Sequence, residues 1–375
     1  MIKVNLQYEW HPAPDDGHAI DAMLFRILLA IAESGSLAGA ARGLGLSYRH
    51  VWGLMGKWEK VFGKPLVELR QGHGAQLTEC GRKLLWAEQL VRARLTHELE
   101  EVRREIEQAL AGDADPVRLG LCASHDLALA ALRDLLAQRD GLKLDLQLQG
   151  SLESLRALEE GRCSLAGFHI AQGMEASASA EFSRYLRPGR HALLGLATRT
   201  QGLMLARGNP KGVRSLADLT RKDVRIVNRQ RSSGSRVEFD QLLSGAGIDP
   251  HAIDGYLNED FTHVAVAATI AGGKADAGYG IRAAAAQYDL DFLPLLSERY
   301  YLACRSRDLG LPEVAQFIEL LRGDELRRIL AALPGYGSAI TGMVYGAAEA
   351  LGGYCISKAV RSSSKKVAAK RARTR

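Results

Sequence analysis

The ten residues 227–236, VNRQRSSGSR, gather many hydrogen-bond donors at one point of the chain. They lie between the apolar pair Ile226 and Val227 and a helical pattern at 237–243. Backbone N–H groups at a helix start are unpaired and partly positive, so they suit an anion. Gly234 would let the backbone approach a ligand, and the serines would add hydroxyl donors. Positive charge would come from Arg229, Arg231 or Arg236. The stretch therefore predicts an oxyanion site, with an ordinary capped helix start as the alternative.

Two further junctions have the same design. CASHDLAL sets Ser124, His125 and Asp126 before a helical pattern, and LQGSLESL sets Gly150 and Ser151 before another. Each alone is an ordinary helix cap, since Ser and Asp are common at that position. Three such junctions that converge would form a binding site.

Motifs of catalysis are missing from the sequence. It contains no G-x-S-x-G elbow, no G-x-x-x-x-G-K-[ST], no H-E-x-x-H and no dinucleotide fingerprint. A hydrolase that uses Ser124 and His125 is a weak alternative, because neighbours in sequence rarely align as nucleophile and base. We expect a binding protein rather than an enzyme.

Strand and helix patterns alternate from residue 117 onwards. VRLGLCAS, LKLDLQLQGS and SLAGFHI read as apolar strands, with helical patterns between them. This alternation favours an open parallel α/β sheet, in which ligands bind at the carboxyl ends of strands. The three donor-rich junctions lie at such ends.

The N-terminal part predicts three short helices. Residues 21–34 are amphipathic, 36–45 are rich in small side chains, and 47–63 begin at a serine cap. A tight turn separates the second helix from the third, whose start is polar and basic, as a helix-turn-helix requires. The predicted DNA contacts, including two in the hairpin described next, are Ser36, Ser47, Tyr48, Arg49, His50, Trp52, Lys57, Lys60, Arg70 and His73. Of these, Arg49 could read guanine, and Lys57 or Lys60 the phosphate backbone.

A hairpin and a long helix follow. KPLVELRQGHGAQLTECG predicts two short strands around a glycine-containing loop, the wing of a winged helix. Apolar residues then recur from 78 to 111 at heptad-like intervals, which predicts one long helix that pairs with its twin in a dimer. GDADP at 112–116 ends that helix.

The net charge of +6 is concentrated at the C-terminus. Residues 358–375 hold eight lysines and arginines and no acid, which leaves a net charge of −2 for the rest of the chain. The pI of about 9.0 therefore reflects a tail of disordered composition, read as a solvated extension or as a non-specific phosphate contact. Five scattered cysteines and no apolar run of signal-peptide length predict a cytoplasmic protein without disulfides and without a membrane segment.

Residues 21–95 resemble the winged helix-turn-helix of LysR-type regulators and, more closely, that of molybdate-responsive ModE-type repressors. The likeness rests on the order of S-G-S, G-x-S-Y, the tryptophan-containing recognition helix and the glycine-rich wing. Residues 117–330 resemble a periplasmic-binding-protein-like domain related to molybdate- and tungstate-binding proteins. The marks are SHD, AGFH, GLMLARGNP, NRQRSSGSR, ADAGYG and FLPLLSERYYL. The family pattern N-R-Q-x-G-S-G-T-R has Ser232 here in place of the first glycine and Ser235 in place of the threonine.

The resemblance implies an α/β fold: an N-terminal winged helix-turn-helix, a long dimerisation helix and a two-lobed type II periplasmic-binding-protein-like domain. One lobe would hold 117–197 and a return segment after Tyr300, and the other 202–299, with Tyr279 facing the cleft. The expected domains are 1–77 for DNA binding, 78–112 for the linker helix, 113–345 for ligand sensing and 346–375 for the tail. The predicted ligand-binding residues are Ser124, His125, Asp126, Gly150, Ser151, Arg229, Gln230, Ser232, Ser233, Gly234, Ser235, Arg236 and Tyr279.

The expected function is that of a regulator that binds a palindromic operator on double-stranded DNA and senses a small anion. It would act as a homodimer, with a tetramer left open. Molybdate or tungstate is the leading effector, because hydroxyl and N–H donors without a cluster of acids suit a tetrahedral dianion. Sulfate, a carboxylate such as formate and a molybdenum-cofactor precursor stay open, as does a transport-type oxyanion-binding protein. No metal site and no covalent cofactor are predicted.

Overall fold

The computed structural model describes residues 4–12, 19–70, 74–109, 118–137, 142–173, 182–231 and 233–351. The chain divides into two compact units, residues 2–110 and 111–375. The long helix therefore belongs to the same unit as the predicted DNA-binding domain rather than standing apart as a linker. Within the described part, no single helix is long and apolar enough to cross a bilayer, and α1 and α2 meet that test only as a pair bent by 120°.

The first unit begins with three helices, α1 (Ala22–Ser34), α2 (Leu37–Leu44) and α3 (Tyr48–Phe62). Asp21, Ser36 and Ser47 cap their N-termini by accepting backbone N–H groups. Gly35 and Gly45 end the first two helices in the left-handed conformation, which leaves room for sharp turns. The predicted helices are confirmed within one residue at each end.

The hairpin β1 (Val67–Arg70) and β2 (Gly74–Leu77) pairs in antiparallel register and forms the predicted wing. It leads into α4 (Glu79–Ala109), whose 31 residues correspond to about 46 Å. One core joins these elements and includes Leu24, Ile27, Val51, Trp58 and Leu66. The dimer expected through α4 stays a prediction.

The second unit opens with β3 (Arg118–Ala123), α5 (Leu127–Ala137), β4 (Lys143–Leu148), α6 (Ser151–Glu159) and β5 (Leu165–Ala171). After the long strand β6 (His191–Leu205) come η1 (Leu216–Thr220), β7 (Asn228–Arg229), α8 (Gly234–Gly245), η2 (Pro250–Ala252), β8 (Glu259–Asp260), α9 (His263–Ala271), β9 (Ala277–Ile281) and α10 (Arg282–Gln287). A second long strand, β10 (Asp291–Arg305), leads to η3 (Ser306–Gly310), α11 (Pro312–Arg322), α12 (Asp324–Ala332), β11 (Tyr336–Gly337), β12 (Val344–Gly346) and α13 (Ala347–Ala350).

The main sheet of this unit has the strand order β11-β6-β10-β5-β3-β4, with β9 and β12 also paired to β6. Strands β3, β4 and β5 are parallel, but β6 and β10 run antiparallel to their neighbours. The prediction of a parallel sheet is therefore wrong for the other strands of this main sheet, although β7 and β8 of the second lobe form a separate parallel pair. The alternation pattern cannot reveal the direction of β6 and β10, because pairing with strands distant in the sequence sets it.

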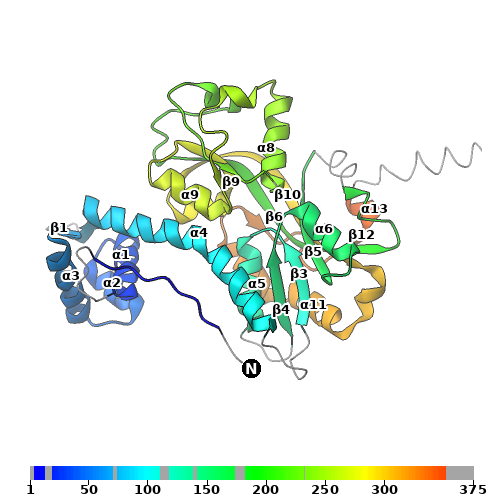
Figure 1. Cartoon of the computed structure of the whole chain (residues 1–375), viewed down its shortest axis with the longest axis horizontal. Coiled ribbons are helices and arrows are strands. Elements are labelled where there is room, and N and C mark those ends of the chain that lie inside the picture. Colours follow the sequence, from blue (N-terminus) through cyan, green and yellow to red (C-terminus); the bar gives the residue numbers. More distant parts are fainter. Residues whose placement is uncertain are drawn as a thin grey trace, which may run out of the picture. The chain divides into compact units, whose positions relative to one another are not determined.

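Strands β6 and β10 pass through both lobes and pair with each other along nearly their whole length (Figure 1). At one end they pack with β3, β5, α5 and α11 in the cores of the first lobe. At the other end they pack with α8, α9 and β9 in the cores of the second. The described structure thus confirms the expected two lobes with crossing chains.

The register of this strand pair shifts twice. One shift falls between Pro294 and Leu296 of β10, and the other between Tyr300 and Tyr301. Between the shifts lies a short ladder in which Glu298 is paired directly with Arg199.

The predicted tail begins too early. Strand β12 pairs with β6, and α13 buries Ala347 and Ala350 against the first lobe. The ligand-sensing unit therefore extends to at least Leu351, which is buried. Residues 352–375, with the basic cluster, lie outside the described residues.

Candidate functional site

Arg199 is the centre of a buried polar cluster between the lobes. It lies in the middle of β6 and only 1% of its surface is exposed. Its guanidinium donates to Glu298 on β10 and to Asp126 at the start of α5, and its Nη2 lies 3.3 Å from His169 Nδ1 on β5. It also stacks over the ring of Tyr300, 4.9 Å from the ring centroid.

Paired carboxylates keep Arg199 charged. Burial alone would lower the pKa of the guanidinium, but Glu298 and Asp126 outweigh burial and raise that pKa well above its ordinary value. Asp126 has three further partners. Its Oδ1 caps α5 by accepting the N–H groups of Ala128 at 2.8 Å and Leu129 at 3.1 Å, and its Oδ2 accepts the Tyr336 hydroxyl at 2.6 Å. The start of α5 is thereby fixed to β6.

His169 presents a hydrogen-bond donor toward the second lobe. Arginine nitrogens only donate, so the Nδ1 atom beside Arg199 must accept, and the ring proton of neutral His169 then lies on Nε2. Burial lowers the pKa of His169 to about 4, so the ring is neutral at neutral pH. Nε2 is buried and makes no hydrogen bond to the described residues. It is a free donor.

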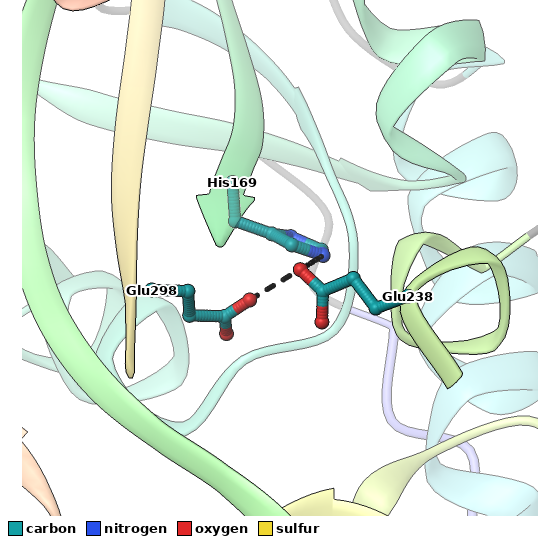
Figure 2. Close-up of side chains that lie close together, drawn as sticks. All are labelled: His169, Glu238 and Glu298. Atoms are coloured by element: carbon teal, nitrogen blue, oxygen red, sulfur yellow. Dashed lines mark ion pairs between the residues drawn. The ribbon is translucent and has the colours of Figure 1, made fainter. Parts of the chain in front are cut away.

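Two glutamates from different elements face this donor (Figure 2). Nε2 of His169 lies 3.6 Å from Glu238 Oε1 on α8 and 3.7 Å from Glu298 Oε2 on β10. Burial and the neighbouring Glu298 raise the pKa of Glu238 well above its ordinary value. Burial also acts on Glu298, but Arg199 and His169 outweigh it and lower its pKa. A proton in this pair therefore favours Glu238, and the negative charge favours Glu298.

The second lobe adds further polar groups. Gln201 on β6 donates to Ser235 Oγ at 3.0 Å and to Glu298 Oε1 at 3.1 Å. Arg229 is 2% exposed, and burial together with the nearby Arg199 lowers its pKa to about 9. Its guanidinium thus stays charged at neutral pH.

The three junctions singled out in the sequence lie together around His169. A Cβ atom on Gly234 would lie 2.5 Å from His169 Nε2 and 3.3 Å from Ser151 Oγ, so only glycine permits this approach of α8. Ser151 begins α6, and Asp126 reaches the same place through Arg199. The starts of α5, α6 and α8 therefore converge, while their role in binding stays a prediction.

The remaining predicted ligand residues differ in where they lie. Ser233 caps α8 by accepting the N–H of Arg236, and Gly150 caps α6. Ser124 and His125 are half-buried beside Asp126, and the Ser124 carbonyl accepts the Tyr300 hydroxyl at 3.5 Å. Gln230 is half-buried next to Arg229 and accepts its Nε at 3.2 Å. Ser232 lies outside the described residues.

Two predicted ligands are occupied with structural contacts. Arg236 pairs with Asp240 and Glu259 and stacks over Tyr256, so its charge is neutralised inside the second lobe. Tyr279 stacks on Phe239 at 5.3 Å and donates to Glu238 Oε2 at 3.4 Å. Tyr279 thus positions Glu238.

Sequence analysis missed Arg199, Gln201 and Glu238, and it quoted His169 and Glu298 only as marks of a family. The expectation that the site lacks a cluster of acids is therefore wrong, since Glu238 and Glu298 join the predicted Asp126 in the cluster. A signal was available in TRTQ and SERYY, where charged and amide side chains interrupt apolar strands.

His169, Glu238 and Glu298 also have the spacing of metal ligands, with ligand atoms within 4.8 Å of one another. A histidine that binds a metal ordinarily donates its other ring N–H to an acceptor. Here that other nitrogen faces Arg199, which holds the proton on Nε2, the atom that would have to bind the ion. We therefore do not assign a metal ion to this trio.

The candidate DNA interface lies on α3. Tyr48 and Trp52 are each 51% exposed and stack on each other at 6.3 Å, although large aromatic side chains are ordinarily buried. Arg49, His50, Lys57 and Lys60 are also exposed, while Val51, Met55 and Trp58 form the buried face of the helix. Ser36 and Ser47 are caps. Nothing is described of the Arg70 side chain or of His73.

These features define a class of protein: a two-lobed α/β ligand-binding domain joined to a winged helix-turn-helix. Residues 133–322, about half of the chain, match the family model of the PBP superfamily domain, and the chain belongs to that superfamily. Residues 23–82 match the model for bacterial regulatory helix-turn-helix proteins of the lysR family, so the first unit is a LysR-type helix-turn-helix domain.

Individual proteins match smaller parts. Uncharacterized protein YvgK of Bacillus subtilis (strain 168) is 32% identical over 197 residues, 52% of this chain and 63% of YvgK. Molybdenum-pterin-binding protein MopA of Rhodobacter capsulatus is 42% identical over 78 residues, 20% of this chain and 29% of MopA. The chain thus spans less than two thirds of either relative. Among solved structures, the Corynebacterium glutamicum OxyR C206 mutant aligns with a TM-score of 0.42 at 16% identity, covering 87% of this chain and 96% of OxyR.

Proposed function

We propose that this protein is a DNA-binding transcription regulator whose two-lobed domain senses a small oxyanion, with molybdate or tungstate as the leading effector. The two domain families support regulation. Homodimers would bind a palindromic operator through two winged helices, and effector binding would shift the dimer between two states of different operator affinity. We propose a binding role rather than a catalytic one.

The observation that carries the effector site is a set of buried polar atoms without hydrogen bonds to the described residues. Ser151 Oγ, His169 Nε2 and Glu298 Oε2 belong to this set, and they lie where the starts of α6 and α8 meet. Each unpaired buried polar atom costs about 1–3 kcal/mol. A ligand between the lobes would remove that cost. Two donors, the helix starts and Arg229 favour an anion.

Molybdate and tungstate are the leading candidates for the effector because a relative of this chain is named for molybdenum binding. MopA is by name a molybdenum-pterin-binding protein. That same name, together with the free acceptor on Glu298, favours a second candidate: a molybdenum-cofactor-related ligand, whose pterin N–H groups would donate to a carboxylate.

Calorimetric titration of the anion-free full-length protein with molybdate, tungstate, sulfate and formate tests the effector. We expect binding of molybdate or tungstate, lost in Ser151→Ala and Arg229→Met and kept in Arg221→Met, because Arg221 is an exposed arginine of the second lobe. If no anion binds, the oxyanion proposal fails. Binding of a pterin alone would move the assignment to the second candidate.

The DNA interface has its own prediction. Arg49→Ala should remove about 1–3 kcal/mol of discrimination at one base pair of each half-site, because a lost base contact affects one position. Lys57→Ala should weaken binding to all sequences alike and reduce the salt dependence by about one counterion. Selected duplexes and fluorescence anisotropy at several salt concentrations measure both effects. Identical profiles for the two variants would contradict the assignment of roles.

A further inference from the structure

The acids of the cluster impose a condition on any anion that binds there. Asp126 and Glu298 carry two negative charges against the single positive charge of Arg199. Arg229, a second buried cation, is close enough to Asp260 for that carboxylate to oppose the lowering of its pKa. Arg236, a third, is already paired with Asp240 and Glu259. The site therefore has no surplus positive charge to neutralise a dianion.

A buried carboxylate strongly repels an anion that binds beside it. Two like charges held close together repel strongly inside a protein, where the effective dielectric constant is far below that of water. Glu298 Oε2 is fully buried and unpaired among the described residues, so a bound anion would face this carboxylate directly. A proton placed between the two would turn the repulsion into a charge-assisted hydrogen bond.

Among the described residues, Glu298 is the group best suited to share this proton. The titratable and charged side chains of the cluster are Arg199 on β6, His169 on β5, Asp126 at α5, Arg229 on β7, His263 on α9, Tyr279 on β9, Tyr300 on β10 and Tyr336 on β11. Burial and the neighbouring Arg229 lower the pKa of His263 well below its ordinary value, which disfavours its protonated form. His169 cannot take a second proton without losing its bond from Arg199, because its remaining lone pair accepts that bond. Glu238 is the member of the pair that favours the protonated form, because burial and Glu298 raise its pKa. Asp126 Oδ2 already accepts from Arg199 and Tyr336.

We propose that the effector anion binds together with one proton, which is held between an oxygen of the anion and Glu298 Oε2. Glu298 is then the residue that determines the protonation state in which the ligand is recognised. The proposal rests on the oxyanion site proposed above. No bond other than the O–H bonds changes: solvent supplies the proton, and it returns to solvent when the anion leaves.

The coupling has a measurable consequence. Where neither the free anion nor the free site carries this proton, the affinity should fall about tenfold for each pH unit upward. The proton taken up should also appear as a dependence of the binding enthalpy on the ionisation enthalpy of the buffer.

The experiment is calorimetry of the full-length protein with sodium molybdate in PIPES and in Tris, at about pH 7 and about pH 8. We expect an uptake of about one proton for each anion bound. Glu298→Gln should abolish both the uptake and the pH dependence, since an amide has no charge to neutralise. Glu238→Gln should keep the uptake, and Glu319→Gln, a change of an exposed acid on α11, should leave both affinity and uptake unaltered.

The outcomes separate the two proposals. Molybdate binding without proton uptake in the wild type overturns the proton coupling and leaves the oxyanion sensor standing. Full uptake in a folded Glu298→Gln variant also overturns it. If that variant does not fold, the wild-type buffer series alone decides. If molybdate and tungstate do not bind at all, the oxyanion sensor fails and the coupling fails with it.

Discussion

Replacement of Arg199 by methionine should destabilise the two-lobed unit by about 3–5 kcal/mol. The change leaves Glu298 and Asp126 buried without their cation, and an unpaired buried charge is among the most costly defects in a protein. Methionine is of similar length and avoids a large cavity, so the loss measures charge rather than packing. Urea unfolding followed by circular dichroism measures the effect.

The chain contains an internal control for this experiment. All four tryptophans, Trp10, Trp52, Trp58 and Trp86, belong to the first unit. Tryptophan fluorescence should therefore show an unchanged transition for the helix-turn-helix unit. The loss of unfolding free energy in Arg199→Met should also become smaller as the pH falls. Without Arg199 the pKa of buried Glu298 rises, and protonation of Glu298 then stabilises the folded form. A deficit that does not depend on pH would contradict the role of charge.

Replacement of His169 by glutamine should make the free energy of unfolding less dependent on pH between about pH 6.5 and 4. The pKa of His169 is about 4 in the folded protein against an ordinary 6.5, so below about pH 6.5 the unfolded chain binds a proton that the folded chain refuses. The wild type should thus lose about 3 kcal/mol between about pH 6.5 and 4 from this residue. Glutamine does not titrate, so this loss should disappear.

Glu238 acts in the opposite direction. Its pKa is raised in the folded protein, so its contribution to stability is present at low pH and declines as the pH rises above its ordinary value. The comparison of His169→Gln with wild type at each pH cancels this common term. Parallel profiles for the two proteins would show that His169 is not held neutral by burial.

Helix and strand positions were largely predictable, because short-range rules set them. Aspartate or serine caps and left-handed glycines marked the ends of α1, α2 and α3 within a residue. The junctions before α5, α6 and α8 were found because donors at helix starts form a local pattern. The direction of β6 and β10 was not predictable from that pattern, since pairing between Arg199 and Glu298 spans 99 positions.

The acidic residues Glu238 and Glu298 could not be predicted as parts of the site for the same reason. Glu238 lies in the second turn of α8, where a glutamate ordinarily reads as a surface residue, and only packing against β5 and β10 buries it. Conversely, Arg236 looked like an anion ligand, although Asp240 four residues later on the same helix indicates an i,i+4 ion pair. Its second partner, Glu259, depends on the tertiary fold, which spacing in the sequence does not reveal.

The two register shifts that bracket the ladder of Arg199 and Glu298 add one extra residue to β10 at one end and one to β6 at the other. Bulges increase local twist and weaken the ladder at both boundaries. We therefore expect the two lobes to rotate relative to each other at the short segment between the bulges, while the ion pair of Arg199 and Glu298 stays closed. Because the axis of this rotation would pass through the buried cluster, the far ends of α8 and α11 would move further than the cluster itself.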